Sequence, residues 1–139
     1  MSKWSYQDMC RRDWILFWDE EYDECKYQLG GIRRFSDVCP SQIRTLLDEK
    51  LMDGKDRQNA APCARKFLEF CEKHADKTTW YLHGYAVAWA RDDCRVSIEG
   101  IGTRKPIYDE KLIKEFRKLN EMADECRATL GEPLYCWYD

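Results

Sequence analysis

The stretch "WYLHGYAVAWARDDCRVSIEGIG", residues 80–102, decides the expected fold. Apolar and aromatic residues lie on both sides of the polar tetrapeptide Arg91-Asp92-Asp93-Cys94, a pattern that predicts two antiparallel strands joined by a turn. Alternate side chains of a strand point to the same face, so the first strand has one large aromatic face. That face carries Tyr81, His83, Tyr85, Val87 and Trp89.

The register of this hairpin is predicted from which faces match. A slip of one residue moves every side chain to the other face, so only a turn of even length sets the aromatic face opposite apolar residues and glycines. Large rings beside glycines cover exposed backbone and stabilise sheets. We therefore expect the aromatic face to point into the core, with the pairs Trp89–Val96, Val87–Ile98, Tyr85–Gly100 and His83–Gly102.

A first helix is predicted near the start of the chain. Ser5 followed by Asp8 three residues later is a plausible N-terminal capping pattern. Apolar residues then recur at spacings of three and four, which indicates one continuous helical stripe that ends at Gly30-Gly31. The stripe consists of Trp14, Trp18, Tyr22, Cys25 and Leu29.

Two further helices are predicted before the hairpin. Proline suits the first position of a helix, so one helix begins at Pro40 and the next near Pro62. Asp53-Gly54 ends the former, and the polar loop "KDRQNAA" separates the two.

The residues after the hairpin predict a long amphipathic helix and a short strand. The helix runs from Asp109 to about Leu130, and "LYCWYD" after Pro133 forms the strand, paired with either strand of the hairpin. The expected fold class is α+β, with a small antiparallel or mixed sheet packed on helices. We expect a single domain, 1–139, with a helical part, 1–77, and a ββαβ part, 78–139.

Eight cysteines need an explanation. No two have C-x-x-C spacing, so zinc ribbons and thioredoxin-type redox motifs are excluded. An even count also permits disulfides or a metal site of another kind. Free thiols are favoured, because several cysteines fall on apolar helical phases and no secretory signal is visible. The expected location is therefore the reducing cytoplasm.

Charge and hydropathy argue against two classes of partner. The longest apolar run, "WILFW", is far too short to cross a bilayer, so no membrane association is expected. The formal net charge is −3, and carboxylates outnumber basic residues near both ends of the chain. Nucleic-acid binders neutralise phosphates with lysine and arginine, so this distribution does not favour nucleic acid.

The common motifs of active sites are absent. The sequence has no H-E-x-x-H, G-x-S-x-G or Walker-type phosphate loop, so we predict no catalytic residue and no cofactor. Cys71 and His74 lie three residues apart on a predicted helix and, with His83, are weak candidates for a zinc site.

The preferred hypothesis is a non-enzymatic interaction module that binds another macromolecule, a protein. Carboxylates in residues 19–24 can imitate a phosphate array and fit a basic groove. An inhibitor of a nucleic-acid-handling enzyme, such as a mobile-element or phage-type antagonist, would act in this way. The expected contact residues are Asp19, Glu20, Glu21, Asp23 and Glu24, with Trp4, Tyr135 and Trp137.

Two alternatives stay open. A nucleic-acid-binding domain would stack bases on Tyr81, Tyr85 and Trp89 if these rings were exposed beside Arg91, Arg95 and Arg104. A zinc-dependent enzyme would use Cys71, His74 and His83. The oligomeric state and the identity of the partner are not predicted.

Overall fold

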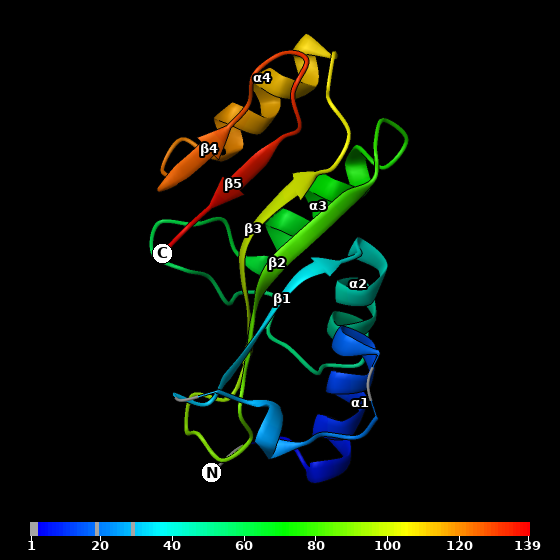
Figure 1. The fold of residues 1–139 in the computed structure, drawn as a ribbon, viewed down its shortest axis with the longest axis vertical. Helices are drawn as coiled ribbons and strands as arrows, with labels where there is room; N and C mark the ends of the chain where they lie inside the picture. Colours follow the sequence, from blue (N-terminus) through cyan, green and yellow to red (C-terminus); the bar gives the residue numbers. More distant parts are fainter. Residues whose placement is uncertain (1–2, 19, 29) are drawn as a thin grey trace.

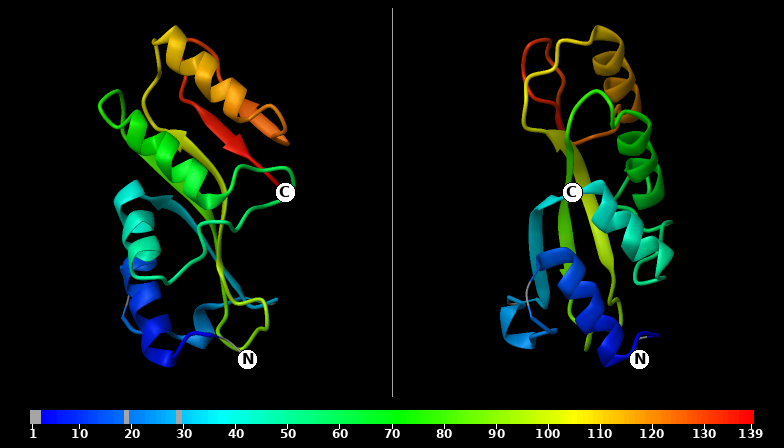
Figure 2. Two further views of the ribbon diagram at one scale, coloured as in Figure 1. Left: turned by 180° about the vertical axis from the view of Figure 1, so that it is seen from behind. Right: turned by 90° about the vertical axis from the view of Figure 1, so that its right-hand side faces the viewer.

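Five strands form one antiparallel sheet in the order β1-β2-β3-β5-β4, and the helices α1 to α4 lie together on one of its faces (Figures 1 and 2). The computed structural model describes residues 3–18, 20–28 and 30–139. The elements in chain order are α1 (Tyr6–Phe17), the short 3-10 helix η1 (Glu24–Lys26), β1 (Ile32–Val38), α2 (Pro40–Asp48), α3 (Ala64–Lys73), β2 (Trp80–Val87), β3 (Val96–Thr103), α4 (Glu110–Leu119), β4 (Glu125–Arg127) and β5 (Tyr135–Trp137).

The α+β class is confirmed, but the predicted order of elements is wrong. Strand β1 lies between α1 and α2 and pairs with β2, with Arg34 opposite Tyr85. The N-terminal part is therefore not three consecutive helices. Within the described ranges, no helix has the length and apolar character that crossing a bilayer requires.

Helix α1 begins as predicted and ends early. Ser5 and Asp8 form the capping box, but the helix stops at Phe17, and Trp18 caps it in the left-handed conformation with φ of 53°. Like charges on adjacent turns destabilise a helix, and the carboxylates after Trp18 would stand on such turns. A bulky residue in this conformation costs about 1–2 kcal/mol relative to glycine.

The predicted apolar stripe of α1 faces solvent. Trp14 and Trp18 are exposed, Tyr22 is buried beyond the end of the helix, and Leu29 lies outside the described residues. The buried face of α1 instead carries Met9, Ile15 and Leu16 together with two charged residues, Arg12 and Asp13.

Helices α2 and α3 begin close to the predicted positions. Pro40 opens α2, and Cys63 caps α3. The side chains that they bury against the sheet include Ile43, Leu46, Phe67 and Leu68.

Helix α4 begins after Asp109, whose carboxylate accepts a hydrogen bond from the Leu112 amide at 3.1 Å. It ends at Leu119 rather than near Leu130, so the prediction of a long helix is wrong. Beyond Leu119 the apolar repeat is not buried as one helical face, since Ala123 packs against the core whereas Cys126 and Leu130 are exposed. Residues Glu125–Arg127 instead form β4 and pair with β5, which satisfies their backbone groups.

The predicted hairpin forms, in a different register. His83 lies opposite Gly100 rather than Gly102, and Tyr81 takes the place opposite Gly102. The next pair is Gly84 with Ile98, which leaves Glu99 as an extra residue in β3. Because of this β-bulge, the side chains of β3 before Glu99 point to the opposite face from the one that unbroken alternation would give them, and Tyr85 lies opposite Ser97. The final strand β5 pairs with the second hairpin strand, with Tyr135 opposite Gly102.

A buried polar network joins α1 to the sheet. Arg12 is fully buried, and its guanidinium donates to the Asp13 carboxylate at 2.9 Å, the Tyr27 hydroxyl at 2.6 Å and the Val87 carbonyl at 3.0 Å. The Tyr27 hydroxyl donates in turn to Asp13 at 2.6 Å, and burial raises the pKa of Tyr27. Each polar side chain of this network has a hydrogen-bonding partner, and these bonds offset the free-energy cost of burying the Arg12 charge.

This network predicts a large difference between two carboxylate deletions. Asp13→Ala leaves the Arg12 charge buried without a counter-ion, so it should lower the free energy of unfolding by about 3–5 kcal/mol. Glu49→Ala breaks the exposed pair with Arg11, which is 2.8 Å long, and should cost at most about 1 kcal/mol. Urea unfolding followed by circular dichroism measures both, and similar costs would contradict the role given to Asp13.

Candidate binding site on the helix-free face of the sheet

The aromatic face of β2 lies on the side of the sheet without helices. Trp80, Leu82 and Ala86 point toward the helices and are buried, whereas Tyr81 and Tyr85 on the opposite face are only half-buried. The prediction that this aromatic face forms the core is therefore wrong for these two tyrosines. Both faces of "WYLHGYAV" carry large side chains, so alternation alone does not show which one the helices cover.

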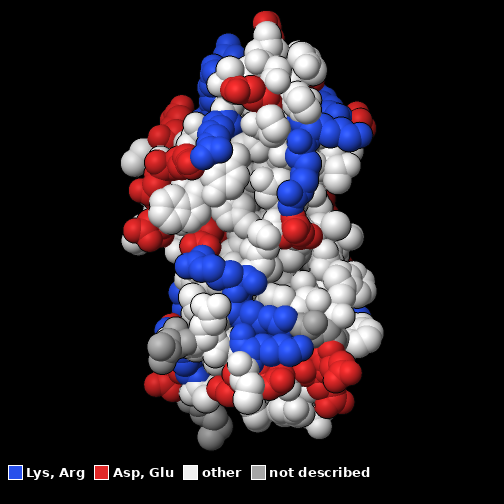
Figure 3. Space-filling view, in the orientation of Figure 1, with Lys and Arg blue, Asp and Glu red and all other residues white. Residues whose placement is uncertain are grey.

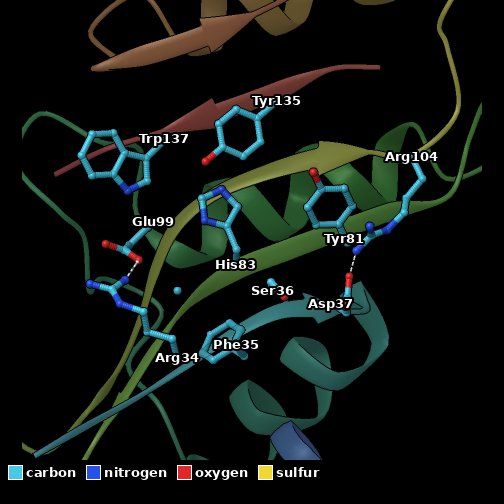
Figure 4. Close-up of a pocket in the computed structure, with 11 residues that line it drawn as sticks. Arg34, Phe35, Ser36, Asp37, Tyr81, His83, Glu99, Arg104, Tyr135 and Trp137 are labelled. Carbon is cyan, nitrogen blue, oxygen red and sulfur yellow. Dashed lines mark hydrogen bonds and ion pairs between the residues drawn. The ribbon is translucent and has the colours of Figure 1, made fainter. Parts of the chain in front are cut away.

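A hollow of about 500 Å³ opens on this face between β1, β2 and β5. In Figure 3 it is the pale depression bordered by basic and acidic side chains, and Figure 4 shows the rings that surround it. The lining residues are Arg34, Phe35, Ser36, Asp37, Tyr81, His83, Gly84, Glu99, Arg104, Tyr135 and Trp137.

Strand β5 contributes two aromatic walls. Tyr135 stacks on His83, with ring centroids 5.2 Å apart and planes 10° from parallel. Trp137 is half-buried, and no described residue hydrogen-bonds its indole or stacks on it. Its ring face and its N–H donor are therefore available to a ligand.

Two glycines of β3 make room for these rings. A β-carbon at position 100 would overlap the Cys136 carbonyl oxygen and approach His83 Nε2 to 2.6 Å. A β-carbon at position 102 would lie 2.7 Å from the Tyr81 hydroxyl and 2.7 Å from the Leu134 carbonyl oxygen. Only glycine lets β5 and the rings of β2 approach β3 this closely.

Gly100→Ala should therefore separate β5 from β3. We expect a loss of about 1–3 kcal/mol in the free energy of unfolding, because the added methyl group meets backbone that cannot rotate away. Gly54→Ala is the matched control, since the three atoms nearest to its β-carbon all belong to the Arg65 side chain, the closest at 3.0 Å, rather than to backbone. Urea midpoints of the two variants make the comparison, and equal midpoints would contradict this view of the β3–β5 contact.

His83 forms the floor between Tyr81 and Tyr135. Its Nε2 donates to the Cys136 carbonyl at 2.8 Å, which assigns the proton to this nitrogen in the neutral ring. Burial lowers the pKa of His83, with Arg34 acting in the same direction, while the Cys136 carbonyl and Glu99 act against it. His83 is thus a neutral member of the aromatic wall near pH 7.

Three arginines stand around the aromatic surface, and each is paired with a carboxylate. Arg34 binds Glu99 at 2.7 Å, Arg127 binds Glu125 at 2.9 Å, and Arg104 binds Asp37. The Arg104 guanidinium also lies over the Tyr81 ring at 4.7 Å, and that of Arg127 over Tyr135 at 5.5 Å. The border of the hollow is therefore close to electrically neutral.

The hollow offers flat apolar surfaces and hydrogen-bonding groups. Ser36 supplies the one serine hydroxyl among the described residues of its lining, a group that acts as a nucleophile in some enzymes when a histidine activates it. No hydrogen bond joins Ser36 to His83 in the described part of the chain. Aromatic walls with a few polar groups are typical of recognition sites.

No protein-family model, curated protein or solved structure matches the chain.

The residues predicted as contacts fall in three places. Tyr135 and Trp137 line the hollow on the sheet. Trp4 lies elsewhere, with its indole N–H donating to the Lys50 carbonyl at 2.9 Å. Glu20, Glu21 and Asp23 line a second hollow. Glu24 of η1 is next to them in the chain, and its carboxylate accepts a hydrogen bond from the Tyr22 hydroxyl at 2.6 Å. Asp19 is outside the described residues.

The weak metal candidates are not brought together. Cys71 is a buried residue of α3, and His74 at the end of the same helix faces Glu115 at 3.1 Å, whereas His83 is on the other side of the sheet. Across residues 3–18, 20–28 and 30–139, no group of three metal-ligating side chains is assembled. All eight cysteines are free; Cys71, Cys94 and Cys136 are buried, whereas Cys25, Cys39 and Cys126 are exposed.

Several residues of the hollow are not predicted from the sequence. Arg34 and Asp37 belong to β1, whose apolar and β-branched residues between Gly31 and Pro40 are the one available signal. Glu99 reaches the hollow because of the bulge, for which Gly84 and Gly100 inside the two strands are the available signal.

The two histidines predict how stability depends on pH. Burial lowers the pKa of both His74 and His83, so the folded chain binds fewer protons than the unfolded chain below their ordinary pKa of about 6.5. The free energy of unfolding should therefore fall as the pH is lowered from about 7.5 to 5. His83→Gln keeps an N–H donor for Cys136 and should lose part of this dependence. Urea titrations at a series of pH values measure it, and an unchanged slope in the variant would contradict a buried neutral His83.

Proposed function

We propose that the protein is a non-enzymatic binding module that recognises another protein through the helix-free face of its sheet. The observation that carries this proposal is the hollow walled by Tyr81, Tyr135 and Trp137 and bordered by paired arginines. Tyrosine, tryptophan and arginine dominate the binding energy of protein interfaces, where they cluster around a central pocket.

The neutral border favours a protein over nucleic acid. Proteins bind phosphates through lysine and arginine side chains that replace the counter-ions condensed on the nucleic acid. Arg34, Arg104 and Arg127 each already bind a carboxylate, and the chain as a whole is acidic. A protein surface, with apolar groups at its centre and hydrogen-bonding groups at its edge, matches both features.

Single-stranded nucleic acid is the second candidate. It is supported by the partial exposure of Tyr81 and Tyr85 beside Arg34, Arg95 and Arg104, which meets part of what base stacking requires. Trp89, the third ring of that hypothesis, is away from the hollow, because its indole N–H donates to the Trp4 carbonyl at 2.9 Å and its ring contacts Tyr6.

The free state of all eight cysteines supports a reducing compartment, and we propose the cytoplasm as the place of binding. Since the preferred function needs only recognition, no cofactor enters the proposal.

Removal of one aromatic wall tests the proposal. Immobilised protein is used to capture its partner from an extract of the source cells, and the affinity of the captured protein is then measured by calorimetry. Trp137→Ala should weaken binding roughly 30-fold, since an interface hot spot is worth about 2 kcal/mol. Tyr108→Ala removes an exposed aromatic ring that does not line the hollow, and it should leave affinity unchanged.

Nuclease treatment of the extract separates the two candidates. A protein partner should be captured equally well after treatment. Capture that disappears with nuclease, together with quenching of tryptophan fluorescence by an oligonucleotide at moderate salt, would support the nucleic-acid candidate instead. A partner that binds Trp137→Ala as tightly as the wild-type chain would place recognition on another surface.

A further inference from the structure

A second hollow, of about 690 Å³, lies beside α1 and the segment that follows it. Figure 3 shows acidic side chains gathered at this end of the molecule, away from the hollow on the sheet. Its lining combines rings and carboxylates: Tyr6, Trp14, Glu20, Glu21, Tyr22, Asp23 and Lys26.

Large aromatic side chains are exposed along the outer face of α1. Tyr6 is 41% exposed, Trp14 48% and Trp18 70%. Tyr6 and Trp14 stand eight positions apart and both line the hollow, whereas Trp18 follows directly after the last residue of α1. Exposed rings that cluster beside a hollow are typical of a contact surface rather than of scattered surface residues.

The backbone at Trp18 gives a separate indication. Its φ of 53° is a conformation in which helix ends usually have glycine. Its indole is mostly in solvent, so packing within the chain does not compensate for the strain. A strained residue with an exposed ring suggests that the ring has a use outside this chain.

The carboxylates specify what the surface can bind. Glu20, Glu21 and Asp23 border the rings, against the single lysine, Lys26, in the same lining. Guanidinium and ammonium groups bind the faces of tryptophan and tyrosine, and they pair with carboxylates. The two features together fit arginine or lysine side chains and repel phosphates.

We infer that this aromatic and acidic surface docks an arginine- or lysine-bearing segment of a partner protein. The site is separate from the hollow on the sheet, and it goes beyond the proposed function by giving the chain a second recognition surface with a defined preference for charge. Trp14 and Trp18 stack on the cationic side chains, while Glu20 and Glu21 pair with them.

The test uses two synthetic glycine–serine peptides, one carrying several arginines and its twin carrying uncharged citrulline at the same positions. Binding is followed by the indole N–H signals of Trp14 and Trp18 in nuclear magnetic resonance spectra at low salt. The arginine peptide should shift both signals, and the shifts should shrink as salt is added. Equal shifts with the citrulline peptide would overturn the inference.

Charge reversal provides the first matched comparison. Glu20→Lys with Glu21→Lys should weaken binding of the arginine peptide at least about tenfold. Glu69→Lys with Glu121→Lys changes the net charge equally at exposed positions outside this lining, and it should have little effect. Equal weakening in both double variants would mean that net charge alone attracts the peptide, which overturns the inference.

Backbone strain provides the second comparison. Trp18→Gly and Lys50→Gly both place glycine at a residue with positive φ, so neither should lower the midpoint of urea unfolding. Only Trp18→Gly should weaken binding of the peptide. Binding that is unchanged by Trp18→Gly but lost in Trp137→Ala would move the peptide to the sheet, and would overturn this second surface while leaving the proposed function intact.

Discussion

The close contact between β3 and β5 is the constraint on which the rest of the candidate site depends. β5 meets the sheet through a short row of bonds, among them Thr103 N–H to the Leu134 carbonyl at 2.9 Å and Tyr138 N–H to the Glu99 carbonyl at 2.9 Å. Gly100 and Gly102 make that approach possible, because any side chain there would meet backbone or a ring. The same contact holds β4 and orients His83, so the aromatic walls depend on two positions that bear no side chain.

One-sided packing explains why the sheet is free to bind. The four described α-helices lie on the side of the sheet to which Trp80, Leu82 and Ile101 point, and they leave the opposite face without a second layer. A sheet with rings on its open face is costly for a chain that works alone. The proposed partner would supply the missing layer over this face, and the surface beside α1 would add a contact with a different charge preference.

The sequence predicts elements wherever a local signal is strong. The capping residues Ser5 and Asp109 mark the starts of α1 and α4, and Pro40 marks that of α2. Apolar periodicity predicts the wrong buried face where apolar residues face solvent, as Trp14 and Trp18 do. A helix face that binds a partner has the same apolar spacing as one that packs in the core. Of the hollow, Tyr135 and Trp137 are predicted as contacts, whereas Glu99 depends on a bulge and Arg34 on a strand, β1, whose short apolar signal does not show that it pairs with β2.

The paired arginines have a consequence for the speed of association. Long-range attraction raises encounter rates only where a surface carries net charge, and the Arg34–Glu99, Arg104–Asp37 and Arg127–Glu125 couples cancel at the distance of an approaching molecule. A partner meeting this face would arrive by unguided diffusion, on the order of 10⁵–10⁶ M⁻¹s⁻¹. Selection among competing partners would then be made after collision, by how long each one stays.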